Sequence, residues 1–336
     1  MHFWAVIVQH GQVQDTLECL ESVLTHPGVR AVVVDNASPH EDLESLRAWA
    51  RGELPVAIRY PDRDIGPEAV PKPVAYDELA PSDRALEREA RLWILHLAEN
   101  RGYAGAINAG WRLIQDRYED EVVVVLNNDV VLAPDFWVHL EALLRSGPPR
   151  AIIGPLVLDY ADASDWQRPE RRPPSPWTWP LRAWAFWRRR RGKNSIWYPL
   201  FWHLPSRPAW VYMLPGSCWV FPAEVFRAIR QLDEGTFLYW EESVLAERAR
   251  SLGIGMRFEP RLRIYHKWSR TARGDHWEAF VRSGAYYLRR YRGAGPREMA
   301  LWRLIWGLQA AVRAIRQPKG KRWSWWRRAW LLLQEI

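Results

Sequence analysis

Five short, almost continuous runs of apolar residues constrain the fold of this 336-residue chain more than any other feature. The runs lie at residues 3–8, 29–38, 91–100, 121–126 and 151–160, and helical patterns separate several of them. A strand that is covered by helices on both faces is apolar throughout, whereas a strand with one wet face alternates. The sequence therefore predicts an α/β fold with a mostly parallel sheet and helices on both of its faces.

The segments between and after these runs predict the other elements. Helices are expected at about 13–26, over 102–118, from Pro134 to about Arg145 and within 232–253. Residues 61–91 are rich in proline and charge, and they are interpreted as an insertion that ends in a helix at about 82–91. Residues 256–271 predict two short strands with His266 at the exit.

Charge is distributed unevenly along the chain. The formal net charge is +8, but residues 163–207 carry a net +8 and residues 301–336 a net +7, which leaves −7 on the remainder. These two basic segments also hold 13 of the 23 tryptophans. Arginine beside tryptophan suits an anionic surface with an apolar layer beneath it. The basic segments, including the four consecutive arginines within 177–204, therefore predict contact with an anionic membrane surface or a lipid-linked diphosphate.

Two alternatives stay open for the basic segments. Aromatic rings between arginines also suit single-stranded nucleic acid, although the high Trp and Leu content and the lack of a nucleic-acid-binding motif argue against it. A helix expected from residue 301 has one apolar face, formed by Leu301, Leu304, Ile305, Leu308, Val312 and Ile315. The alternative for this face is ordinary packing against the body of the protein.

Cysteine content and hydropathy favour a cytoplasmic protein. Cys19 and Cys218 are too few for a disulfide framework or a cysteine-based zinc site, and they predict buried thiols in a reducing compartment. The apolar run at the N-terminus is too short for a signal peptide, and no stretch approaches the roughly 18 uninterrupted apolar residues of a transmembrane helix. We expect a protein that is soluble or bound at the inner face of the cell membrane.

Polar residues stand at the carboxyl ends of three predicted strands. They are Asp35 and Asn36, then Asn100 and Arg101, and finally Asn127, Asn128 and Asp129 within VVVVLNNDVVL. Ligands of parallel α/β sheets bind at these ends, so the three groups predict one crevice. An acidic residue among amides there suits Mg²⁺ or Mn²⁺ held between the protein and a diphosphate. For Asp129 the alternative is a turn that closes the strand.

Seven motifs in order resemble those of the family 2 inverting glycosyltransferases of GT-A fold. They read VIVQHGQ, VVVDNAS, ENRGYAGAINAG, LNNDVVLAPDF, PGSCWVFPAEVF, LDEGTFLYWEES and YHKWSRT, and the resemblance covers about residues 3–160 and 208–292. It is closest to the bacterial rhamnosyltransferase-like branch. It implies a Rossmann-like GT-A domain over 1–292, with insertions at 61–91 and 163–207, and a C-terminal amphipathic helical segment at 293–336.

The resemblance implies that residues at the strand ends bind the nucleotide. Asp35 would hydrogen-bond the base or ribose, with Asn36 beside it, although a strand-end turn is the alternative for Asn36. The loop that closes on the nucleotide would comprise Asn100, Arg101, Gly102 and Gly105, with Asn108 one turn into the helix. For its glycines, a plain helix entry is the alternative.

The resemblance also implies a metal site. Asn127, Asn128 and Asp129 match the family's Asp-x-Asp position, with Asn in place of the first acid. Asp129 would therefore be the main ligand of Mn²⁺ or Mg²⁺, and His266 stands where the family places a histidine near the metal and the diphosphate. For a lone histidine the alternative is a structural role.

A catalytic base is implied in the WEES stretch. Glu241 and Glu242 stand where the family usually has Glu-Asp, and the second residue, Glu242, would take the proton of the acceptor hydroxyl. The chain departs from the family in this longer side chain and in the Ser243-Val244-Leu245 that follows, which leaves Glu241 as the other candidate. A charged helix start is the alternative for both glutamates. Trp219 and Trp240 would stack on sugar or pack in the core.

The function implied is transfer of a sugar, with inversion, from a nucleoside diphosphate donor such as dTDP-rhamnose or a UDP-sugar. The acceptor would be an envelope polysaccharide or a lipid-linked glycan. A non-catalytic nucleotide-sugar- or glycan-binding member of the fold is the first alternative, because of the departure in WEES. A basic nucleic-acid-binding protein is the second. A dinucleotide-dependent oxidoreductase is disfavoured, since no G-x-G-x-x-G follows the first strand.

Overall fold

The computed structural model describes residues 1–62, 70–83, 90–115, 121–147, 150–167, 169–171, 173, 206–267, 277–316 and 322–336. Most of the Trp- and Arg-rich insertion, including the stretch 177–204, lies outside these described residues. So does most of the helix that the sequence predicts at about 82–91.

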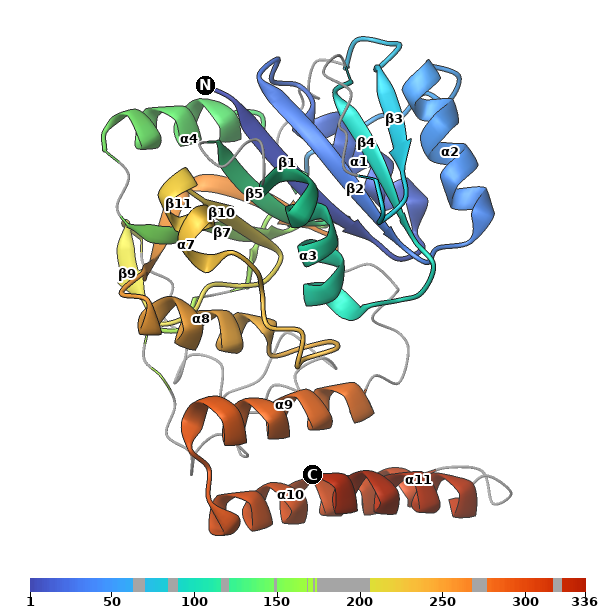
Figure 1. Ribbon diagram of the computed structural model, residues 1–336, viewed down its shortest axis with the longest axis vertical. Coiled ribbons are helices and arrows are strands. Elements are labelled where there is room, and N and C mark those ends of the chain that lie inside the picture. Colours follow the sequence, from blue (N-terminus) through green and yellow to red (C-terminus); the bar gives the residue numbers. More distant parts are fainter. Residues whose placement is uncertain are drawn as a thin grey trace.

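Five parallel strands form one half of the sheet (Figure 1). In spatial order they are β3 (Tyr76–Leu79), β4 (Leu92–Leu97), β2 (Val29–Asn36), β1 (Phe3–Gln9) and β5 (Val122–Asn127). Each neighbouring pair runs parallel. The strands predicted at 3–8, 29–38, 91–100 and 121–126 are therefore confirmed. The interpretation of 61–91 as an insertion is wrong in part, because β3 within it is the edge strand of the sheet.

The other half of the sheet is mixed. β10 (Cys218–Phe221) runs antiparallel between β5 and β7 (Ala151–Asp159), and β11 (Gly255–His266) runs parallel to β7. Three short strands complete this half: β6 (Val130–Leu132), β8 (Asp165–Gln167) and β9 (Ala209–Val211). The prediction of two short strands within 256–271 is wrong. That segment contributes to one long strand, whose register shifts between Glu259 and Arg263 where it passes along β7.

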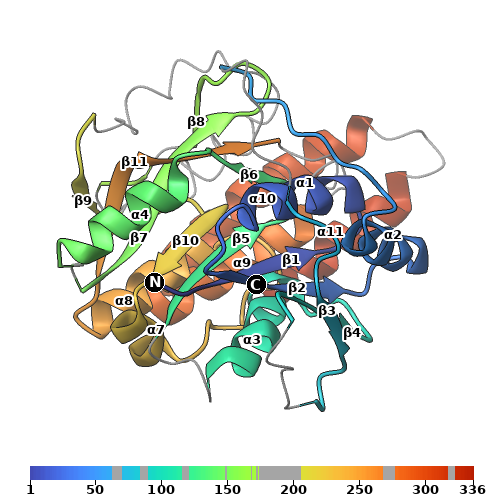
Figure 2. The ribbon, with the colours of Figure 1, turned by 90° about the horizontal axis from the view of Figure 1, so that it is seen from above.

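Helices cover both faces of the sheet (Figure 2), as predicted from the continuous apolar strands. One face packs on α1 (Val13–Val23), α2 (His40–Arg51) and α4 (Phe136–Arg145). The other packs on α3 (Gly102–Gln115), α7 (Ala223–Ile229) and α8 (Glu241–Ser251). β1 shows the alternation, since Phe3, Ala5 and Ile7 enter the first core and Trp4, Val6 and Val8 the second.

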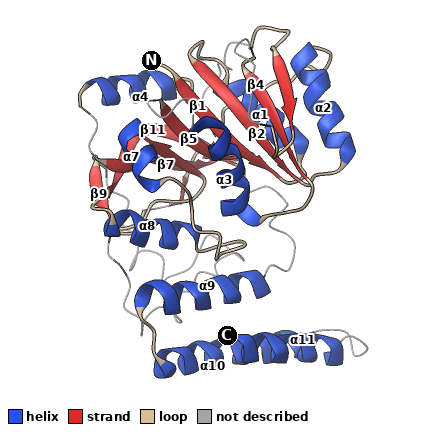
Figure 3. Cartoon of the chain, in the orientation of Figure 1, coloured by secondary structure: helices blue, strands red, loops and turns tan. Residues whose placement is uncertain are grey.

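Three further helices form a separate layer beyond the carboxyl ends of the parallel strands (Figures 1 and 3). They are α9 (Trp277–Arg292), α10 (Pro296–Arg316) and α11 (Arg322–Glu335). Trp302 and Trp306 of α10 are fully buried against α9, together with Trp240 at the start of α8. In the described part of the chain, no helix is long and apolar enough to cross a membrane.

The predicted apolar face of α10 is not its packing face. The buried side consists of Met299, Trp302, Trp306, Ala310 and Ala314. Four residues of the predicted face, Leu304, Leu308, Val312 and Ile315, are each at least half exposed. Packing against the body, one of the two interpretations of this face, is therefore contradicted for these four side chains.

Candidate active site

Asp35 and Asn36 end β2 at the carboxyl edge of the sheet, and both are buried. Asp35 accepts a hydrogen bond from the Ser38 amide, and its Oδ2 lies 3.7 Å from Nδ1 of His96 on the neighbouring strand. Asp35 and then Glu78 raise the pKa of His96. Asp35 is therefore held beside the His96 ring at the strand end, where the family resemblance implies a nucleotide contact.

Asn36 holds the loop that enters α3. Its Nδ2 donates to Asn100 Oδ1 at 3.0 Å and to the Gly102 carbonyl at 3.2 Å, and its Oδ1 accepts from the Arg101 amide at 2.8 Å. The Asn36 side chain is thus occupied within the protein, and its contacts are those of a positioning residue. The Arg101 side chain is exposed beside it.

Gly102 is required by the same loop. Its φ is +71°, and a Cβ there would lie 2.3 Å from the Phe237 carbonyl oxygen. The next residue, Tyr103, donates its amide to that carbonyl at 3.1 Å. Gly105 lies close behind, where a Cβ would come within 2.9 Å of the Arg101 Cβ. Gly102 therefore serves a close approach between the α3 entry and the loop before α8, and Gly105 leaves room for the Arg101 side chain.

Asn108 reaches that loop from inside α3. It is buried, donates from Nδ2 to the Leu232 carbonyl at 3.0 Å and to Glu234 Oε1 at 2.7 Å, and accepts from the Leu232 amide at 2.7 Å. The family resemblance implies that Asn108 lies near the nucleotide. Its contacts instead fix the segment that carries the chain toward Glu241.

The Asn-Asn-Asp segment follows β5. The Asn127 amide donates to the Ser217 carbonyl at 3.1 Å, which joins this strand end to the loop before β10. Asn128 Nδ2 donates to Thr16 Oγ1 at 3.1 Å and to the Gly11 carbonyl at 3.3 Å, which anchors the start of α1. Asn128 is therefore a positioning residue, and Asp129 is left to face the site.

Asp129 and His266 form a buried pair. Asp129 Oδ1 lies 3.0 Å from His266 Nε2, although the two residues are 137 positions apart. Two ligands bound at right angles, each about 2.1 Å from a divalent ion, lie about 3 Å apart, so the pair has the spacing of adjacent metal ligands. The described residues contain no cluster of three His, Cys, Asp or Glu side chains that could hold a metal by themselves. The arrangement fits an ion that takes further ligands from a diphosphate.

Glu241 and Glu242 begin α8 after a strained turn. Tyr239 and Trp240 both have positive φ, +70° and +73°, which costs a residue with a side chain roughly 1–2 kcal/mol. Such strain persists only where packing enforces it, and here the Trp240 ring is buried and its Nε1 donates to the Phe280 carbonyl at 2.9 Å. The turn presents both carboxylates at the positive end of the helix.

The two glutamates have different surroundings. Burial raises the pKa of both, and the charge of Glu242 raises that of Glu241 further. Glu242 is half-buried and accepts from the Gly216 amide, and a Cβ on Gly216 would lie 2.8 Å from Glu242 Oε1. Glu241 is buried, and its Oε1 has no hydrogen-bond partner in the described part of the structure. Glu242 is therefore the more accessible of the two carboxylates, and it lies against Gly216.

Two residues at the site escaped the sequence analysis. Tyr103 donates to the Gly216 carbonyl at 3.0 Å, and the charges of Glu241, Glu242 and Asp129 add to the burial that raises its pKa. Gln9 ends β1 opposite Asp35, fully buried, and neither polar atom of its side chain has a hydrogen-bond partner among the described residues. Gln9 could have been found from the sequence, because it is a polar residue directly after the apolar run FWAVIV. Tyr103 had no such signal.

The two tryptophans considered for sugar stacking are core residues. Trp219 is fully buried and lies 6.2 Å from the Tyr103 ring. Trp240 is buried and stacks on Tyr287 at 5.5 Å. Of the two interpretations, core packing is the one that these contacts support.

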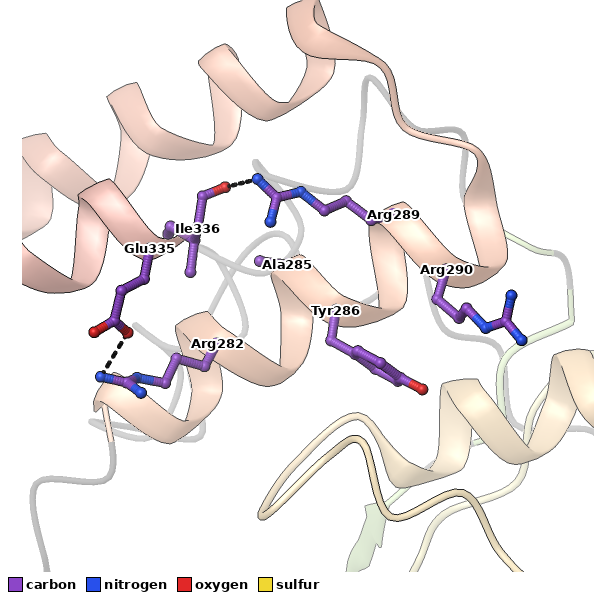
Figure 4. Close-up of a pocket in the computed structure, with 7 residues that line it drawn as sticks. All are labelled: Arg282, Ala285, Tyr286, Arg289, Arg290, Glu335 and Ile336. Atoms are coloured by element: carbon purple, nitrogen blue, oxygen red, sulfur yellow. Dashed lines mark hydrogen bonds and ion pairs between the residues drawn. The ribbon is translucent and has the colours of Figure 1, made fainter.

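A cavity of about 480 Å³ lies elsewhere, between α9 and the end of α11 (Figure 4). Arg282, Arg289, Arg290 and Tyr286 line it, and Arg282 forms an ion pair with Glu335 at 2.8 Å. None of the strand-end residues lines this cavity. It is therefore separate from the candidate site.

The chain is similar to known proteins in parts of its sequence and in its fold. Residues 78–229 match the family model described as glycosyl transferase family 2. The low-salt glycan biosynthesis hexosyltransferase Agl10 of Haloferax volcanii is 27% identical over 181 residues, which are 52% of this chain and 53% of that protein. A crystal structure of GalNAc-T7 with UDP, GalNAc and Mn²⁺ aligns with a TM-score of 0.51 at 14% identity, over 87% of this chain and 49% of that one.

The chain has a GT-A glycosyltransferase fold, as its mostly parallel sheet and its similarity to the GalNAc-T7 structure show. Residues 78–229, less than half of the chain, therefore carry the sequence features of glycosyl transferase family 2, and the curated relative is named a hexosyltransferase. The chain spans about half the length of that relative.

Proposed function

We propose that this chain is an inverting glycosyltransferase that moves a sugar from a nucleoside diphosphate donor to a hydroxyl of a glycan or lipid-linked acceptor. One observation carries the proposal. The loop at Gly216 and Ser217 links the Glu241–Glu242 pair to the Asp129–His266 pair: Glu242 Oε1 lies against Gly216, and the Ser217 carbonyl accepts from the Asn127 amide, two residues before Asp129. A metal-binding pair and a base on either side of a reacting carbon are what a displacement at a sugar diphosphate requires.

The donor half of the site would lie along β1, β2 and β5. Asp35 and Gln9 are the buried polar groups at the first two strand ends, and they suit hydrogen bonds to the base and ribose. Arg101 is exposed at the next strand end and suits the diphosphate. The UDP in the GalNAc-T7 crystal structure supports a nucleotide donor. The rhamnosyltransferase-like branch makes dTDP-rhamnose the first donor to test, and UDP-sugars the second.

A divalent ion, Mn²⁺ or Mg²⁺, would be held by Asp129 and His266 and would supply positive charge to the leaving diphosphate. The Mn²⁺ in the GalNAc-T7 crystal structure supports a divalent ion at this fold's site. Asn127 and Asn128 would shape the turn that carries Asp129, since Asn128 is committed to α1.

In the acceptor half, Glu242 takes the proton of the attacking hydroxyl. The hydroxyl oxygen forms a bond to the anomeric carbon as the bond from that carbon to the phosphate oxygen breaks. The nucleoside diphosphate leaves with the electron pair, and the configuration inverts. The raised pKa of Glu242 favours this role, because a base with a pKa nearer neutrality takes a proton more readily.

We further propose that the acceptor is an envelope polysaccharide or a lipid-linked glycan at the inner face of the cell membrane. The name of Agl10, a hexosyltransferase of glycan biosynthesis, supports a glycan acceptor. The net +7 of residues 301–336 and the net +8 of residues 163–207 support an anionic membrane beside the acceptor.

The test is turnover of a panel of nucleotide sugars by the full chain, with Mn²⁺, with Mg²⁺ and with chelator. We expect one donor to be hydrolysed slowly in the presence of metal, and the chelator to abolish this hydrolysis. Metal-dependent binding of a donor with no turnover, even when acceptor glycans are supplied, would favour a non-catalytic member of the fold. Tight oligonucleotide binding that Asp129→Ala leaves unchanged, with no nucleotide-sugar binding, would favour a nucleic-acid-binding protein.

A further inference from the structure

α10 and α11 lie side by side beneath α9 and expose apolar side chains. On α10 these are Leu304, Leu308, Val312 and Ile315, and on α11 they are Trp323, Trp326 and Trp330. Within each helix the residues are spaced by three or four, so each set lies along one side. We name these seven residues the α10–α11 surface.

The exposure does not come from unpacked helices. Trp302 and Trp306 of α10 and Leu332 of α11 are almost fully buried in the same cluster as α9. Each helix therefore has a packed apolar side and a second, exposed apolar side. Exposed apolar side chains gathered on two adjacent helices mark a contact with something outside the chain.

Basic residues surround the exposed tryptophans. Arg322, Arg327 and Arg328 are exposed on α11, and residues 301–336 carry a net +7. Arg328 forms an ion pair with Glu278 of α9 at 2.8 Å, and Arg322 donates to the Ile315 carbonyl at 3.0 Å, so both also hold the layer together. Tryptophan and leucine with arginine at one surface complement a layer that is apolar below and anionic above.

We propose that the α10–α11 surface lies in the headgroup region of an anionic phospholipid bilayer, with both helices in the plane of the membrane. This surface would be the part of the chain that contacts the membrane. The proposal rests on the proposed function only in assuming that the acceptor lies at that membrane. A bilayer with anionic headgroups fits this surface because the exposed apolar side chains lie in a segment with a net charge of +7, in which Arg322 and Arg327 are next to Trp323 and Trp326.

Docking by this surface brings the candidate site toward the membrane. The α9–α11 layer lies beyond the carboxyl ends of the parallel strands (Figure 1). α9 is also tied to the turn before Glu241, because Ser283 Oγ donates to the Leu238 carbonyl at 3.0 Å and the Phe280 carbonyl accepts from Trp240. An acceptor that is held in the bilayer by a lipid would thus reach the catalytic edge of the sheet from the nearer side.

The experiment is cosedimentation of the full chain with vesicles of phosphatidylcholine alone or with 30% phosphatidylglycerol. We expect binding to the anionic vesicles that falls as salt rises, and at least tenfold weaker binding for the double variant Leu308→Asp, Trp330→Asp. Both side chains are exposed, so the variant should keep the circular dichroism and melting temperature of the native chain. Val138→Asp is the matched control, since Val138 is 67% exposed on α4.

Three outcomes would overturn the proposal. The native chain could stay in the supernatant with anionic vesicles at low salt, or the double variant could bind as well as the native chain. Alternatively, sedimentation velocity could show a dimer that the double variant abolishes, which would assign the surface to a second copy of this chain. Vesicle binding needs no nucleotide sugar, so the two tests are independent. Absence of vesicle binding would not contradict the proposed enzyme activity, and absence of donor turnover would not contradict the proposed membrane surface.

Discussion

Glu242 is the residue on which the proposed chemistry depends most. Its carboxylate is held between the start of α8 and the amide of Gly216, and burial raises its pKa. Glu241, one position earlier, is buried with an oxygen that has no hydrogen-bond partner in the described residues. These surroundings favour Glu242 as the base, and the charge of Glu242 adds to the burial that raises the pKa of Glu241.

Substitutions of Glu242 and Glu241 should show which of the two carboxylates is the base. We expect Glu242→Gln to lower the transfer rate by roughly 10²–10⁴-fold, the usual contribution of a general base, and Glu242→Asp to keep a measurable part of it. Glu241→Gln should lower the rate less than Glu242→Gln. Initial rates with donor and acceptor at saturation measure this, and a larger loss from Glu241→Gln would exchange the two roles.

The pH profile should report the raised pKa. A base works only when it is deprotonated, so the rate should rise with pH through the pKa of Glu242. Because burial raises that pKa, the rise should be centred above the ordinary glutamate value of about 4.3. The profile of kcat against pH in the native chain measures it, and a rate that is already constant from pH 4.5 upward would contradict the assignment.

At the scale of elements, the loop between Leu232 and Trp240 connects the two halves of the site. Asn108 of α3 fixes its start, the Phe237 carbonyl receives the Tyr103 amide at its centre, and α9 holds its end at Trp240. The donor-side loop at Gly102 and the acceptor-side helix α8 are therefore parts of one assembly. A change in this loop should reach both substrates.

Gly102→Ala tests this connection. The new Cβ would have both an unfavourable φ of +71° and a contact of 2.3 Å with the Phe237 carbonyl oxygen. Gly253→Ala is the matched control, because Gly253 has a φ of +66° with nothing within 4 Å of its Cβ position. We expect the control to lose about 1–2 kcal/mol of unfolding free energy and Gly102→Ala to lose more, by urea unfolding. Equal losses would show that the contact is not tight.

The edge strand β3 should depend on pH through Glu78. Arg47 of α2 donates two hydrogen bonds of 2.7 Å to this carboxylate, and with His96 it lowers the pKa of Glu78 to about 2. A lowered pKa means that ionised Glu78 stabilises the fold above the ordinary pKa of about 4.3 and that this contribution is lost as pH falls toward 2.

We therefore expect Glu78→Gln to be less stable than the native chain at pH 7, with the difference shrinking between pH 4.5 and pH 2. Urea unfolding across this range measures it. Glu224→Gln, in an exposed ion pair with Arg150 at 3.2 Å, is the control and should change stability little at any pH. A difference for Glu78→Gln that stays constant down to pH 2 would contradict the role of ionised Glu78.

Sequence patterns predicted the parts of the molecule whose signals are local. The strands at 3–8 and 121–126 have apolar runs of their own, and the motif order resembles that of the family whose model matches residues 78–229. β3 and α2 escaped because one is short and polar and the other is rich in charge, so neither stands out from a loop. The partners of Asn108 lie 124 residues away, which no local pattern indicates.

At the scale of the whole molecule, the sheet, the candidate site and the helical layer follow one another along a single direction (Figure 1). In the proposed function the strand ends would supply the donor side and α8 the base, and α9 packs between the start of α8 and the helices α10 and α11. The net +7 of residues 301–336 fits such an order, because this charge and the carboxylates of the candidate site belong to different parts of the chain.

The most direct test of the central claim compares Asp129→Ala with Glu242→Gln in both nucleotide binding and turnover. Calorimetric titration with the nucleoside diphosphate and Mn²⁺ measures the first, and release of nucleotide from the donor in the presence of acceptor measures the second. We expect Asp129→Ala to lose metal-dependent nucleotide binding, and Glu242→Gln to keep that binding while losing turnover. Native turnover in Glu242→Gln, or native metal-dependent binding in Asp129→Ala, would contradict a site with a metal-bound donor on one side and a carboxylate base on the other.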